Sequence, residues 1–284
     1  MKLNKNKLII ILFCLVFSKI FCLDIETAIN SGNSILNHNG TFYKIPDFGF
    51  KLVLNEDLGK SIHGTLAVER EPGIGNTVWS RVSYIKDYLQ IGIGPTLGIL
   101  NTDSLKSNFI TFFQPGFGIT MSFRTPKGFL AAIDTNFSIP FMSGKQNSIY
   151  LQHGYIEFGW QFPNIITALK LTQKNKAIVK DSGEIYVTVT DIGLYTTAYS
   201  KPSKIRIPFN FIYRENRFNK KDSVSENKKI NSMVLETGFT HVISSEIEWF
   251  IHFGAAVFSF SGNEQISPLK NFLFNAEAGI RFSI

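Results

Sequence analysis

Histidine, serine and carboxylate side chains at fixed spacings are what hydrolytic catalysis needs. A histidine two residues before a serine would place a base and a nucleophile on one face of a strand. None of the histidines in the 284 residues has this neighbour, and the nearest approach is His63-Gly64-Thr65. Asp-x-Asp and Asp-x-His pairs are also missing from the sequence. The sequence therefore predicts that the protein is not an enzyme. Its histidines are His38, His63, His153, His241 and His252.

Metal binding has one candidate group of residues. Glu246, Glu248 and His252 fall on the same face of a predicted strand, and carboxylates and imidazoles are both metal ligands. The same residues also serve as partners in ion pairs, which is the interpretation that we favour. We therefore expect no metal site and no cofactor.

The N-terminal residues resemble an export signal. Lys2, Lys5 and Lys7 precede an apolar stretch from Leu8 to Phe17, which is too short for a membrane-spanning helix. We predict a signal peptide over 1–22, with a lipidated Cys22 as the alternative. Cys14 and Cys22 are the only cysteines, so we expect no disulfide in the mature chain.

The composition is that of a folded chain with an unusual number of phenylalanines. Apolar residues make up 44% and charged residues 18%, which excludes disorder, and two cysteines exclude a disulfide scaffold. The chain has 27 Phe, 9 Tyr and 3 Trp, yet its mean hydropathy is only +0.06. Much of the formal charge of +7 lies in the predicted signal peptide, and no nucleic-acid motif is present, so we expect no nucleic-acid partner.

Beyond residue 23, apolar residues recur at every second position, which is the period of a β-strand. In the C-terminal segment 271–284, Phe272, Phe274 and Phe282 alternate with Asn275, Glu277 and Arg281. Several such segments exceed the length common in soluble sandwiches and reach that of membrane-spanning strands. The predicted strands are 61–70, 76–85, 88–100, 107–123, 128–139, 148–162, 164–173, 183–199, 204–214, 231–243, 246–260 and 269–284.

Short and long connections alternate along these strands, as in barrels with short periplasmic turns and long extracellular loops. The sequence therefore predicts an all-β fold, a closed antiparallel transmembrane β-barrel of 12 strands over 56–284. Residues 23–55 are then an N-terminal extension that could plug the lumen. The alternative is 14 strands, with Phe48–Leu54 as one further strand and another hidden within 27–40. Ile25, Ala28 and Ile29 have a more helical spacing, which argues against that alternative.

At this point the chain resembles the bacterial outer-membrane β-barrel proteins, over residues 56–284. The terminal strand Gly279–Ile284 is similar to the C-terminal signal read by the barrel-assembly machinery, although it ends in Ile where Phe is more usual. The Lys, Asn, Ile and Phe bias resembles that of small spirochaetal outer-membrane proteins. The resemblance implies an outer-membrane location, with membrane lipid and the barrel-assembly machinery as partners. The enzymes of this class need the His-x-Ser, Asp-x-Asp or Asp-x-His pairs that are missing here.

The polar face of each predicted strand should line the lumen. Charges of both signs are interspersed on it, which suggests a lattice of ion pairs. Tight turns would place Glu157 opposite Lys170 and Glu236 opposite His252 inside the barrel, with Phe239 opposite Trp249 outside. The lumen candidates are Glu69, Arg81, Arg124, Asp134, Glu157, Lys170, Arg206, Arg214, Glu236, Glu246, Glu248, His252, Glu277 and Arg281.

Two functional classes fit this architecture. The first is a narrow pore for small polar solutes, or a purely structural barrel. The second is a surface-exposed adhesin that binds a host or polysaccharide ligand through basic extracellular loops. A soluble secreted β-protein or lipoprotein is a further alternative. The basic-loop candidates are Lys174, Lys176, Lys180, Lys220, Lys221, Lys228 and Lys229.

Overall fold

The computed structural model describes residues 23–37, 39–101, 111–138, 149–180, 183–200, 204–220, 227–262, 264–266 and 272–283. The predicted signal peptide lies outside these residues. Within them, no helix combines the length and the apolar character that crossing a membrane requires.

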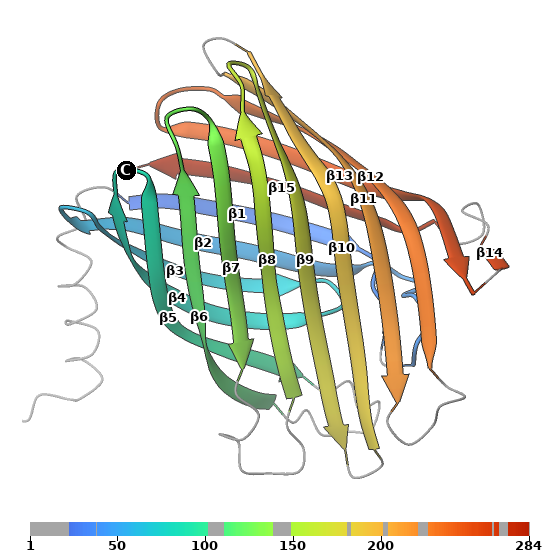
Figure 1. Cartoon of the computed structure of the whole chain (residues 1–284). Coiled ribbons are helices and arrows are strands. Elements are labelled where there is room, and N and C mark those ends of the chain that lie inside the picture. Colours follow the sequence, from blue (N-terminus) through green and yellow to red (C-terminus); the bar gives the residue numbers. More distant parts are fainter. Residues whose placement is uncertain are drawn as a thin grey trace, which may run out of the picture.

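The described residues form one antiparallel sheet that closes on itself (Figure 1). Each strand pairs with its neighbour in the chain, β13 pairs with both β12 and β15, and β15 pairs with β1. The result is a closed barrel of 14 strands, to which β14 adds a short pairing at the end of β13. The strands are β1 Leu23–Gly32, β2 Asp47–Gly59, β3 Ile62–Glu71, β4 Gly75–Lys86, β5 Leu89–Asn101, β6 Thr111–Arg124, β7 Phe129–Ser138, β8 Ile149–Gln161, β9 Ile165–Lys180, β10 Gly183–Tyr199, β11 Ile205–Lys220, β12 Lys228–Val242, β13 Ile247–Ser261, β14 Glu264–Ile266 and β15 Phe274–Ser283.

The all-β closed barrel is confirmed, but the count of 12 strands is wrong and the alternative of 14 is correct. Residues 23–32 and 47–59 are strands of the wall instead of parts of an extension. The spacing between Ile25 and Ile29 misled the prediction, because residues four apart share a face in a helix and in a strand alike. Ala28 is 4% exposed and points inward, between two outward-facing residues of β1.

The apolar residues at every second position of the strands face outward. Phe158, Leu169, Phe209 and Ile93 all leave more than half of their side-chain surface exposed on the exterior. The inward parity carries glycine, hydroxyl, amide and charged side chains, so the interior is the polar side. This division explains how so many phenylalanines coexist with a neutral mean hydropathy.

A β-bulge in β13 keeps the apolar face outside along the whole strand. The register between β12 and β13 shifts between Met233 and Val234, which leaves Val257 as an extra residue. Before the bulge the outward residues of β13 have odd numbers, and after it Phe258 and Phe260 are exposed outward. Without the extra residue, both rings would point into the lumen.

Connections differ at the two ends of the barrel. At one end all strands are joined by short turns. The other end has longer segments such as 33–46, but also short connections between β3 and β4 and between β9 and β10. The register of β8 with β9 is confirmed, since Glu157 lies opposite Lys170.

The register of β12 with β13 was predicted two residues off. His252 lies opposite Gly238, Glu236 lies opposite Gly254, and Trp249 lies opposite His241. The turn between the two strands is longer than the three residues assumed. A shift of two residues preserves the faces, so the rings of Phe239 and Trp249 still lie 5.4 Å apart.

Candidate functional site

The described residues between β1 and β2, 33–37 and 39–46, turn into the barrel, and we call them the strap (Figure 1). Asn33 anchors its start, because the Asn33 amide donates to the carbonyl of Phe272 at 2.8 Å and its oxygen accepts from the backbone N–H of Phe274 at 2.9 Å. The Asn37 side chain closes a tight turn by accepting from the N–H groups of Asn39 and Thr41. Sequence-local turn chemistry therefore folds the strap back on itself.

The strap packs against apolar side chains on the part of the barrel wall formed by β10, β11 and β12. Leu36 is 0% exposed, and together with Ile35 it packs against inward-facing residues of β10, β11 and β12 and against Ile74. Burial of both side chains stabilises the seated position, because each removes apolar surface from water. The receiving residues are Val187, Val189, Phe218 and Ile230.

A buried ion pair holds the strap from the side. The Arg214 guanidinium on β11 binds Asp191 on β10 through two parallel hydrogen bonds of 2.8 and 2.7 Å. Its remaining arm donates to Ser34 Oγ of the strap at 2.8 Å. The side chains of Arg214 and Asp191 are only 9% and 7% exposed, so this pair is screened from solvent. The planar fork of arginine suits such a two-pronged contact.

A second ion pair spans the lumen at the same end. Lys174 on β9 binds Glu71 at the end of β3, and five strands of the wall lie between these two strands in the sheet. The contact therefore runs across the barrel and not along the wall. Together with the strap it narrows the lumen at the end of the longer connections.

Next to this constriction lies a cavity of about 550 Å³. Most of the residues that line it are polar or charged, and they come from strands on several sides of the barrel. Charges of both signs face it, as the lumen prediction requires. The charged residues of the lining are Lys51, Glu69, Arg70, Glu71, Lys170, Lys174, Asp191, Arg214, Glu236 and Glu277.

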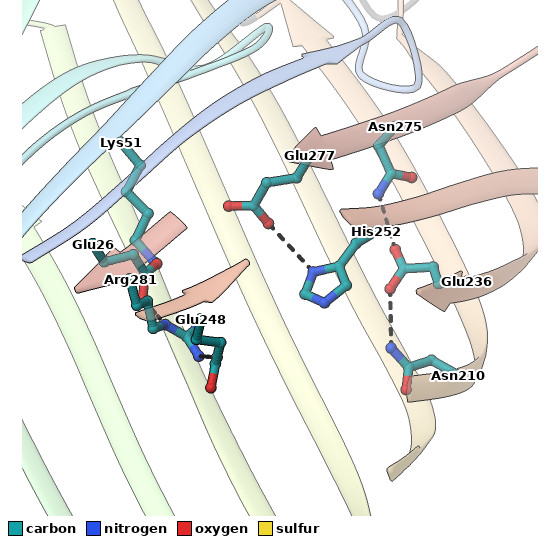
Figure 2. A network of polar contacts seen from close by, with 9 residues as sticks. All are labelled: Glu26, Lys51, Asn210, Glu236, Glu248, His252, Asn275, Glu277 and Arg281. Carbon is teal, nitrogen blue, oxygen red and sulfur yellow. Dashed lines mark hydrogen bonds and ion pairs between the residues drawn. The ribbon is translucent and has the colours of Figure 1, made fainter. Parts of the chain in front are cut away.

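An ion-pair network crosses the junction where the first strand meets the last (Figure 2). Arg281 on β15 binds Glu26 on β1 and Glu248 on β13, the latter at 2.6 Å. Glu26 also binds Lys51 on β2 at 2.7 Å, and Glu248 also binds Arg206 on β11. The network borders a smaller cavity of about 350 Å³ at the end of the short turns. It joins residues that are far apart in the sequence and so stabilises the closure of the barrel.

We expect Arg281→Gln to weaken that closure modestly. The Arg281 side chain is 44% exposed, so each lost ion pair should cost no more than about 1 kcal/mol. The measurement is the temperature at which the fast-migrating folded band converts to the unfolded band in a gel. That temperature should fall more for Arg281→Gln, which loses two ion pairs, than for Arg217→Gln, which loses one exposed pair with Glu215 away from the junction.

The other predicted lumen residues lie on the inner face with a variety of partners, except Glu246, which precedes β13 and was wrongly placed in the lumen. Lys170 is 3.7 Å from Glu157, and the His252 ring is 3.7 Å from Glu277. Glu236 is not paired with His252; it accepts hydrogen bonds from Asn210 and Asn275. Asp134 accepts a hydrogen bond from Thr120, Arg81 donates to Asn136, and Glu69 accepts from Trp79. Arg124 is exposed at the end of β6, and Glu246 lies in an exposed turn.

The predicted basic loops are largely strands. Lys174, Lys176 and Lys180 belong to β9, Lys220 to β11, and Lys228 and Lys229 to β12, while Lys221 lies outside the described residues. Lys174 faces the lumen, and Lys228 donates to the carbonyl of Gly40 in the strap at 3.1 Å. Lys229 pairs with Glu215. The strands continue beyond the boundaries inferred from the sequence, so these lysines do not form one loop surface.

Several residues of the site were missed. Glu26 and Lys51 were assigned to the extension, Glu71 to a loop, and Asp191 and Ser34 were not singled out. A signal existed for Glu71 and Lys174, since each continues the inward parity of its strand from Glu69 and Lys170. For Ser34 the sequence carries no such signal, because its partner Arg214 is distant in the chain.

Comparison with known proteins supports the fold. No protein-family model and no curated relative matches the sequence. Among solved structures, a bacterial polysaccharide outer membrane secretin matches with a TM-score of 0.53 and 11% identity, over 92% of this chain and 97% of that chain. An outer membrane channel from Pseudomonas putida F1 matches with a TM-score of 0.52 and 7% identity, over 92% and 95%. The chain has the fold of the bacterial outer-membrane β-barrel proteins.

The apolar exterior fits this fold, because lipid-facing residues of such barrels are apolar and their lumen is polar. The described residues form a 14-stranded barrel with this fold. In outer-membrane barrels the short turns lie at the periplasmic end and the longer loops at the extracellular end. The strap and the Glu71–Lys174 pair lie at the end that corresponds to the extracellular side in those barrels.

Proposed function

We propose that the chain is a narrow channel for small polar solutes whose lumen is closed on the extracellular side by the strap. The observation that carries this proposal is the polar cavity of about 550 Å³ that lies inside the barrel beside the strap. Cavities of this size accommodate small molecules. Carboxylates and ammonium groups both face it, which argues against strong ion selectivity.

The fold likeness supports the proposal. The Pseudomonas putida barrel is described as an outer membrane channel, and this chain covers nearly all of its length. A channel of this kind needs no catalytic residues, in keeping with the sequence. The strap adds the expectation that the resting conductance is small.

The strap can be tested with one substitution, Leu36→Asp. Leu36 is fully buried, so an aspartate there would place an unpaired carboxylate among apolar side chains, which costs several kcal/mol. The desolvation cost of the carboxylate exceeds the stabilisation that remains once the leucine contacts are lost. The strap should therefore move out of its position inside the barrel. The matched control is Ile45→Asp, in the same segment but 77% exposed.

Planar-bilayer recording on the purified barrels measures the result. We expect small conductance steps for the unmodified protein and for Ile45→Asp, and steps several-fold larger for Leu36→Asp. Equal steps in all three proteins would show that the strap does not obstruct the lumen. If none of them conducts at any voltage while all migrate as folded barrels, the channel proposal is wrong and a structural barrel is favoured.

A further inference from the structure

Glu236 is a lumen carboxylate that is held in place by amides (Figure 2). Its Oε2 accepts from the Asn210 amide and its Oε1 from the Asn275 amide, both at 3.2 Å. Glu236 lines the cavity, and no Lys, Arg or His among the described residues forms an ion pair with it. The two amides fix the direction of the carboxylate without neutralising its charge.

The cations nearby are committed to other carboxylates. Lys170 lies 3.7 Å from Glu157, and Arg214 binds Asp191 through both of its prongs. Neither Lys170 nor Arg214 lies within ion-pair distance of Glu236. Glu236 therefore keeps a charge that no described cation contacts directly.

The residues around Glu236 lie opposite one another on neighbouring strands and form one row across the sheet. Tyr195 lies opposite Asn210, Asn210 lies opposite Glu236, and Glu236 lies opposite Gly254. Gly254 in turn lies opposite Asn275. A Cβ at Gly254 would come within 2.6 Å of the Asn275 Oδ1 and 2.7 Å of the Glu236 Cγ, so the glycine leaves the space that this contact needs.

Aromatic rings of the same cavity already hold an ammonium group. The Lys170 Nζ lies 3.9 Å from the ring centroid of Tyr155 and 5.5 Å from that of Tyr195. Ring faces attract cations within such distances. Tyr195 belongs to the row that contains Glu236, so an ammonium near the carboxylate would meet both a charge and a ring.

We propose that Glu236, with Asn210, Asn275 and Tyr195, forms a site for the ammonium group of a small solute inside the lumen. The inference rests on the proposed channel function, since the solute must reach the lumen. It adds a preference for one chemical class to a pore of otherwise mixed charge.

The test uses the full barrel folded in detergent and two probes of equal size, ethylammonium and neutral ethanol. Saturation-transfer NMR titrations should show binding of ethylammonium and none of ethanol. Glu236→Gln keeps the shape and removes the charge, so it should weaken ethylammonium binding about three- to fivefold. Glu215→Gln removes a carboxylate that pairs with Arg217 and Lys229 outside this cavity, and should leave binding unchanged.

Two further arms keep the outcome decisive. Asn275→Ala removes the amide that fixes Glu236 Oε1 and should weaken ethylammonium binding, which tests the site even if Glu236→Gln does not fold. Potassium chloride at the concentration of the ammonium salt should displace little ethylammonium; full displacement would overturn the assignment of the ligand class. Binding that is equal for both probes, or insensitive to both variants, would overturn the site.

Equilibrium binding also separates this inference from the channel proposal. If the barrel does not conduct in bilayers but binds ethylammonium through Glu236, the channel proposal fails and the site remains. If the barrel conducts but does not distinguish ethylammonium from ethanol, the site is wrong and the channel remains.

Discussion

Asp191→Ala should destabilise the folded barrel by about 3–5 kcal/mol, because removing one partner of a buried ion pair leaves the other charge uncompensated. The Arg214 guanidinium would keep its buried position with Ser34 Oγ as its remaining side-chain partner. The expected effect is large because both side chains are almost completely shielded from solvent. The free energy of unfolding, measured by denaturant titration in detergent, would report it.

Two controls identify the cause of that loss. Replacing both partners, as in Asp191→Leu with Arg214→Met, removes the buried charges together and should recover most of the stability. Arg217→Gln breaks a more exposed pair with Glu215 and should cost less than about 1 kcal/mol. A single Asp191→Ala variant as stable as Arg217→Gln would contradict the role given to the buried pair.

Asp191→Ala should also affect the strap. Asp191 fixes the guanidinium that donates to Ser34, so its loss should loosen the strap and raise the bilayer conductance in the same direction as Leu36→Asp. Stability loss without any change in conductance would separate the ion pair from the strap.

The outer face of the barrel was predictable from the sequence and the strap was not. The lipid contact selects apolar side chains at every second position, so single strands such as β15 reveal their two faces locally. Leu36, in contrast, is buried by residues of β10 to β12 that are distant in the chain. No local sequence pattern predicts that a connection folds into the lumen, because this depends on the residues of β10 to β12 that it contacts there.

The errors in strand number and register have equally specific causes. In β1 the polar Thr27 separates the outward-facing Ile25 and Ile29, and a spacing of four suits a helix and a strand alike. Glu236 and His252 were placed opposite each other because the length of the turn was assumed. Turn length fixes the register of a hairpin, and the faces survive an error of two residues but the partners do not.

Leu169→Arg should cost about 2–4 kcal/mol if the exterior of the barrel contacts lipid, the range found for arginine on the lipid face near the bilayer midplane. Leu169 is 58% exposed on the outer face of β9. Thr172→Arg provides the matched control in the same strand, because Thr172 lines the cavity and its new charge would face the polar lumen. Unfolding titrations in lipid bilayers would measure both variants.

Which of the two variants loses more stability distinguishes a membrane barrel from a soluble β-protein. On a water-exposed surface, exchanging Leu169 for arginine would change stability by no more than about 0.5 kcal/mol. In lipid, the guanidinium has no hydrogen-bonding partners at that depth, so the outward substitution must be the more damaging of the two. If Thr172→Arg destabilises the barrel more than Leu169→Arg does, the exterior of β9 does not face lipid.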